Sequence, residues 1–327
     1  MKSILQSKEM SIVAIVVLLS ITLSFVSPAF LTFENIFDIL KGNAVLGILA
    51  VGMTLVIITG GIDVSVAAVT TAVCVMAGKF LTVLPDSPIS ILLLFIVAPL
   101  IGVLLGALNG ILVSKIQIPA IVVTLGTMSM INGIILYLTN GTYLNSTSFP
   151  KIFVDFANFQ IFGVSVIVFI FAIIAVGTWY ILKYTVIGRE VLAVGGNKES
   201  SIRAGINFDK VQIFVYGYMG LLAGIAAIAQ LSYTKAVDPN GLLGFELQVI
   251  AAVVLGGANI LGGRGSIMGT FLGVLLLGIM QNGLILARID IFWQKVVVGT
   301  IILIAVSYDQ IQYKRSKDKL AKIEVEA

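Results

Sequence analysis

The sequence contains no histidine, the side chain that proteins most often use as a general base, a proton relay or a metal ligand near neutral pH. It contains one cysteine, Cys74, within an apolar run, so the chain can form neither an internal disulfide nor a cysteine cluster for a metal. No apolar run carries paired carboxylates suited to acid–base chemistry. We therefore expect no catalytic residues, no metal site and no enzymatic activity.

Charge is also scarce, because only 11% of the 327 residues are charged, against about 25% in an ordinary soluble domain. Apolar residues make up 59%, and the mean hydropathy is +1.11. A water-soluble fold of this length could not cover so much hydrocarbon, so lipid must be the solvent for most of the surface. The net charge of +4 then reflects membrane topology, and we expect no nucleic-acid partner.

A helix needs about 20 mostly apolar residues to cross the hydrocarbon core of a bilayer. Ten such runs are present, at 11–30, 43–60, 64–84, 89–113, 119–139, 161–182, 211–233, 245–260, 266–287 and 291–308. The run at 245–260 is short, and Gly256 and Gly257 interrupt it. The sequence predicts a single all-α membrane domain over residues 1–327 with about ten transmembrane helices.

Glycines recur at a spacing of four residues within or directly beside three of these runs, which places them on one face of each helix. The stripes are Gly102, Gly106 and Gly110; Gly220 and Gly224; and Gly265, Gly269 and Gly273. Because lipid supplies no hydrophobic drive between helices, close approach of backbones over small residues holds such helices together. We expect the stripes to pack helices against one another within the bundle.

Lysine and arginine are distributed unevenly between the two sides that this topology defines. With ten helices, fourteen of the 20 basic residues fall on the side of the termini and six on the other side. The positive-inside rule therefore places both termini and the basic tail 309–327 in the cytoplasm. The same side receives the loops 61–63, 114–118, 183–210 and 257–265. Glu246 is expected at the outer headgroups, which would leave no acidic chain through the membrane.

The cytoplasmic segment 183–210 reads KYTVIGREVLAVGGNKESSIRAGINFDK and differs in chemistry from its surroundings. Asn197 is a good N-cap, Glu199 lies in the first turn after it, and Gly205 is typical of a helix C-terminus. These residues predict a helix of about two turns over 198–204. By itself the pattern fits a docking element for a partner and a solvated connector equally well.

Four motifs cover nearly the whole chain in the order in which one known family carries them. GREVLAVGGNKESSIRAGI closely resembles the coupling-helix loop of the ribose-type sugar permeases of bacterial ATP-binding cassette (ABC) importers, a family that includes permeases for autoinducer-2 and other monosaccharides. LVIITGGIDVSV at 55–66, IPAIVVTLGTMSMINGI at 118–134 and the block at 251–284 are similar to other signatures of that family. The outer loop 140–160 and the C-terminal tail carry no such signature.

The resemblance implies an ABC importer permease, a ten-helix multi-pass bundle in the bacterial inner membrane. It implies three protein partners: a cytoplasmic ATPase that binds ATP and magnesium, an extracytoplasmic solute-binding protein, and a second permease copy, identical or related. Carried over by motif, the residues that would shape and seat the coupling helix are Gly188, Arg189, Glu190, Gly195, Gly196, Asn197, Arg203 and Gly205. The chain itself lacks the Gly-x-x-x-x-Gly-Lys-Ser/Thr loop that binds nucleotide phosphates, and we expect no cofactor in it.

A route for a polar solute would be lined by intramembrane polar side chains. Our candidates are Asn43, Thr124, Asn132, Gln248 and Asn282, with Phe245 as a gate. Each polar candidate also fits a hydrogen bond between helices. A self-sufficient ion-coupled secondary transporter and an ABC importer of nucleosides stay open as alternatives. The motifs also leave open which sugar or sugar-like solute is carried and whether the two permease copies are identical.

Overall fold

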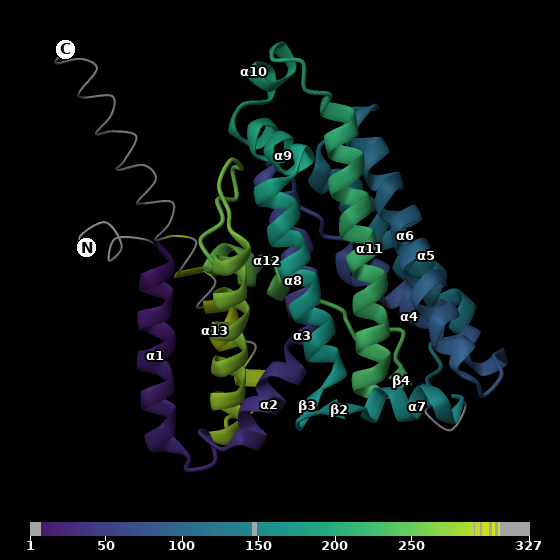
Figure 1. The fold of residues 1–327 in the computed structure, drawn as a ribbon, viewed down its shortest axis with the longest axis vertical. Helices are drawn as coiled ribbons and strands as arrows, with labels where there is room; N and C mark the ends of the chain where they lie inside the picture. Colours follow the sequence, from purple (N-terminus) through teal and green to yellow (C-terminus); the bar gives the residue numbers. More distant parts are fainter. Residues whose placement is uncertain are drawn as a thin grey trace.

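The computed structural model describes residues 8–145, 149–290, 292–294, 296–300, 303–304 and 307. Long helices run alongside one another and form a bundle (Figure 1). The helices are α1 Lys8–Val26, α2 Phe33–Gly42, α3 Ala44–Ile58, α4 Val66–Val83, α5 Pro88–Ser114, α6 Ala120–Thr139, α7 Lys151–Asn158, α8 Val166–Tyr184, α9 Val186–Gly196, α10 Lys198–Arg203, α11 Phe208–Thr234, α12 Phe245–Leu255 and α13 Ile267–Leu286. Two short antiparallel pairs join β1 Leu144–Asn145 to β4 Ala236–Val237 and β2 Gln160–Ile161 to β3 Val164–Ser165.

Seven helices within the described residues are long and apolar enough to span a membrane, namely α1, α4, α5, α6, α8, α11 and α13. The pair α2 and α3, bent by 46° at Asn43, counts as an eighth span if it is taken as one. The all-α membrane character predicted from the sequence is confirmed. The count of ten is not confirmed, and much of the predicted run 291–308, like the tail 309–327, lies outside the described residues.

The predicted span 245–260 is shorter in the structure than in the sequence pattern. Helix α12 ends at Leu255, where Gly256 caps it and Gly257 adopts a φ of +89°. Its 11 residues extend about 16 Å, roughly half the thickness of the hydrocarbon core. A helix of this length reaches only partway through the bundle.

Helix α3 occupies the centre of the bundle, and all 15 of its residues are buried. Helix α11 packs beside it and along α5, where the two predicted glycine stripes meet. A Cβ at Gly106 would collide with the Tyr216 carbonyl and lie 2.9 Å from the Gly220 Cα. Gly269 and Gly273 approach the α12 backbone in the same way. The prediction that these stripes pack helices together is confirmed, except that Gly265 lies in the loop before α13 and meets the Ile58 side chain instead.

The inner loops predicted to share one side do meet at one end of the bundle. The Gly263 N–H donates to the Ile58 carbonyl at 2.9 Å, and residues 59–61, 117–119 and 194 line one cavity there. Helices α9 and α10 stand at this end, and α7 with the β2–β3 hairpin at the opposite end (Figure 1). That the first of these ends faces the cytoplasm stays a prediction from charge.

Candidate coupling region and solute route

The segment 183–210 folds into two consecutive helices, α9 and α10. Thr185 caps α9 by accepting the Gly188 N–H at 3.2 Å. Asn197 then adopts an extended conformation, and its Oδ1 accepts the Ser200 N–H at 2.9 Å, which caps α10. Gly205 follows with a φ of +86°, which glycine adopts without strain. The predicted short helix is confirmed, and it ends at Arg203.

Helix α9 was not predicted, although a sequence signal for it exists. Gly188, Val191 and Val194 recur at a spacing of three residues and are the buried members of the helix. That spacing is the one expected for the inward face of a helix. Arg189 is exposed and Glu190 is half-buried on this helix.

Helix α10 presents most of its surface to solvent. Of its six residues only Ser201 is buried, and Ile202 is 48% exposed. Arg203 and Glu199 form an ion pair of 3.9 Å with side chains 83% and 85% exposed, a geometry that contributes little stability on its own. Lys198 lies 4.0 Å from the centre of the Phe208 ring and ties α10 to α11. The outward face of α10 is therefore available to another protein.

Gly195 joins this region to the core by direct contact of backbones. A Cβ at Gly195 would collide with the Ile58 carbonyl and lie 2.9 Å from the Gly263 nitrogen. A Cβ at Gly262 would likewise lie 3.0 Å from the Gly60 nitrogen. We call these five residues, Ile58, Gly60, Gly195, Gly262 and Gly263, the glycine junction. It connects α9 to the loops that follow α3 and α12.

Next to the junction, Asp63 lies in a buried turn and is 2% exposed. Its Oδ1 accepts the Ser65 N–H at 2.9 Å and the Ser65 hydroxyl at 2.6 Å, and the Asn109 amide donates to that hydroxyl at 2.9 Å. Burial raises the pKa of the Asp63 carboxyl to about 6, and the two bonds from Ser65 partly offset this. The turn fixes the entry into α4, so Asp63 has a structural role.

Most of the polar side chains predicted for a solute route form hydrogen bonds within the protein. The partners are Asn35 for Asn282 (2.7 and 3.1 Å), the Ile39 carbonyl for Asn43 (2.8 Å), the Ile62 carbonyl for Thr124 (3.1 Å) and Gln281 for Gln248 (3.2 Å). The Asn132 side chain instead faces a cavity and forms no hydrogen bond to another described residue. Phe245 is half-buried and packs against the main core. Their roles in transport stay predictions.

Two neighbouring cavities lie along α4, one nearer the outer end and one nearer the middle of the bundle. The outer chamber, of about 200 Å³, is lined by Tyr143, Gln230 and Asp238, among others. The inner chamber, of about 70 Å³, is lined by Met128, Asn132, Leu243 and Glu246 together with Ala67 and Ala68. Thr71 and Leu242 border both chambers and separate them.

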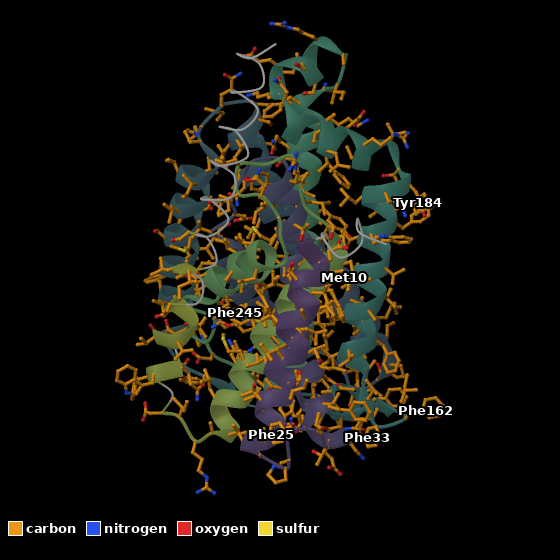
Figure 2. All side chains as sticks on the ribbon, turned by 90° about the vertical axis from the view of Figure 1, so that its left-hand side faces the viewer. Met10, Phe25, Phe33, Phe162, Tyr184 and Phe245 are labelled. Carbon is orange, nitrogen blue, oxygen red and sulfur yellow. The ribbon has the colours of Figure 1, made fainter. Side chains whose placement is uncertain are left out.

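Glu246 therefore does not lie at the outer headgroups, as the sequence suggested. Ala67, Ala68 and Thr71 belong to the first two turns of α4, and Asn132 lies near the middle of α6. In Figure 2 the neighbouring Phe245 stands at about half height, whereas Phe25, Phe33 and Phe162 stand near one end. Sequence reasoning missed this position because a hydropathy profile does not report the depth at which a short helix begins.

Comparisons with known proteins agree with this architecture. Residues 35–306 match the model of a family described as branched-chain amino acid transport system / permease component. The chain is 37% identical to the ribose import permease protein of Escherichia coli K12 over 92% of this chain and 93% of that protein. It is 33% identical to the L-arabinose ABC transporter permease of Azospirillum brasilense (95% and 90%) and 31% identical to an autoinducer 2 import permease of Escherichia coli O9:H4 (94% and 89%). No solved structure matches the chain.

Proposed function

Because this chain belongs to the family of branched-chain amino acid transport system permease components, we propose that it is the transmembrane subunit of an ABC importer for a sugar or a sugar-like solute. Membership makes it a transport permease of the bacterial inner membrane, with several membrane-crossing helices. The ribose, L-arabinose and autoinducer 2 permeases align with more than nine-tenths of the chain, which favours a sugar-like cargo over an amino acid.

In this proposal the chain forms one transmembrane domain over residues 1–327. The segment 183–210 docks a cytoplasmic ATPase, which supplies ATP and magnesium, and the tail 309–327 stays in the cytoplasm. A solute-binding protein delivers the cargo at the outer end, and a second permease copy completes the assembly. These partners are inferred from the motifs that the chain shares with the family.

The observation that carries the proposal is the combination of an exposed helix with a rigid attachment. Helix α10 is capped at both ends and turns Ile202 and Arg203 outwards. The glycine junction behind it leaves no room for a side chain at Gly195. A force applied to α10 and passed on by α9 therefore reaches α3 and the loop after α12 through backbone contacts, as coupling to an ATPase requires.

Reconstitution tests the proposal. The chain, its ATPase and its solute-binding protein are placed in liposomes, and uptake of the solute that co-purifies with the binding protein is measured with and without ATP. Arg203→Glu should abolish ATPase association in a pull-down and reduce uptake at least tenfold, since it places like charges beside Glu199 on the docking face.

Lys115→Glu provides a matched control, because Lys115 is an exposed basic residue at the same end of the bundle, outside α9 and α10. This charge reversal should leave association unchanged. Uptake by the chain alone, driven by a sodium or proton gradient, would instead support a self-sufficient secondary transporter and refute the proposal.

A further inference from the structure

Glu246 occupies the inner chamber because α12 starts deep within the bundle. After α11 ends at Thr234, the strand β4 pairs with β1, and the chain then turns back through residues 238–244. Gly244, with a φ of +82°, precedes the first turn of α12, and Leu242 beside it is 7% exposed. The N-terminal end of a helix stabilises a negative charge in its first turn, where Glu246 lies.

The chambers are acidic. Glu246 and Asp238 line them, and no lysine or arginine among the described residues does. Asp238 accepts the Asn240 N–H at 2.8 Å. The Glu246 side chain forms neither an ion pair nor a hydrogen bond with another described residue. A carboxylate at this depth is costly in a membrane protein, and such groups normally face a water-filled cavity or a ligand.

We infer that Glu246 is a specificity-determining residue of the solute route, which binds hydroxyl groups of an uncharged polyhydroxylated solute and excludes anionic solutes. This inference rests on the proposed function. A carboxylate only accepts hydrogen bonds, so it pairs with hydroxyl donors, while the Asn132 amide both donates and accepts. Leu243 and Met128 supply apolar surface for the carbon–hydrogen face of the same molecule.

The same carboxylate disfavours a phosphorylated or acidic sugar. Two negative charges a few ångströms apart repel one another strongly where protein and lipid exclude water. With about 70 Å³, the inner chamber holds about two water molecules as it stands. Solute must therefore pass when α4 and α12 move apart, and the charge of Glu246 acts on it at that moment.

A reporter cysteine in the chamber tests this inference without knowledge of the cargo. In the assembled transporter, Cys74→Ala removes the natural thiol, and Leu243→Cys places a new one on a chamber residue that is 63% exposed. During ATP turnover the thiol is treated with cationic trimethylammonioethyl methanethiosulfonate or with anionic sulfonatoethyl methanethiosulfonate. Glu246→Gln should lower the ratio of the cationic to the anionic rate about tenfold.

Asp155→Asn is the matched control, because it removes one exposed carboxylate from α7 at the outer end and should leave the ratio unchanged. An equal ratio with Glu246 and with Gln at that position would overturn the inference, and so would a Leu243→Cys thiol that reacts with neither reagent. Uptake that needs no ATPase would refute the proposed function instead, whatever the ratio.

Discussion

Replacing Gly195 by alanine adds one methyl group at the point where α9 meets α3. The added Cβ collides with the Ile58 carbonyl and lies 2.8 Å from the Ile58 carbonyl carbon, closer than such atoms approach in real proteins. Because the obstacle is backbone, no side chain can rotate to relieve it. Overpacking of this kind costs about 1–3 kcal/mol. The carbonyl that is displaced also accepts the Gly263 N–H at 2.9 Å, so the contact with the α12–α13 loop weakens at the same time.

The adjacent glycine provides the control for packing. A Cβ at Gly196 meets nothing within 4 Å, and its φ lies in the range that alanine adopts readily. In detergent, Gly195→Ala should lower the free energy of unfolding by about 1–3 kcal/mol, whereas Gly196→Ala should change it by less than about 0.5 kcal/mol. In liposomes, Gly195→Ala should also reduce the solute transported per ATP hydrolysed. Equal unfolding free energies for the two variants would refute the claim that the glycine junction leaves no room for a side chain at Gly195.

Three further predictions concern packing and pH. Gly106→Val should lower the free energy of unfolding by at least about 2 kcal/mol, because its side chain meets the backbone of Gly220; chemical denaturation in detergent measures this. Protonated Asp63 should stabilise the fold below its ordinary pKa of 3.8, and this stabilisation should be lost as the pH rises through about 6. The pKa difference between the folded and the unfolded chain corresponds to about 3 kcal/mol of unfolding free energy. Asp63→Asn should abolish this part of the pH dependence between pH 4 and 7. A double-mutant cycle of Asn35→Ala and Asn282→Ala should give a coupling energy of about 0.6 kcal/mol, because the two amides bond to one another across α2 and α13; the bond from the Asn35 amide to the Phe30 carbonyl is lost in the Asn35 variants alone and cancels in the cycle.

The features that sequence predicted well are those that short-range chemistry determines. The cap at Asn197 and the stop at Gly205 act within a few residues, and α10 forms between them as expected. Glycines at a spacing of four residues form a smooth face on a helix, which favours close packing of a second helix. The stripe through Gly106 does meet the stripe through Gly220. Whether α10 binds an ATPase stays a prediction.

The features that sequence missed depend on the position of a segment in three dimensions. Glu246 follows an apolar, glycine-containing turn, and hydropathy assigns that turn to the membrane boundary instead of the interior. Only the pairing of β4 with β1 and the return of residues 238–244 show that α12 begins at depth. Likewise, the polar residue Asn282 was a candidate for the route, and its pairing with Asn35 could not be read from residues 247 positions apart.

The two loops of the glycine junction adjoin α4 and α12, two of the helices that line the inner chamber, and this provides a link between docking and passage. Helix α4 begins directly after the loop that contains Gly60, and its first two turns line the chamber at Ala67, Ala68 and Thr71. Helix α12 ends just before the loop that contains Gly262 and carries Glu246 at its other end. Because the Gly195 backbone lies against Ile58, at the end of α3, and against Gly263, a displacement of α9 would press on the segments that lead into α4 and out of α12.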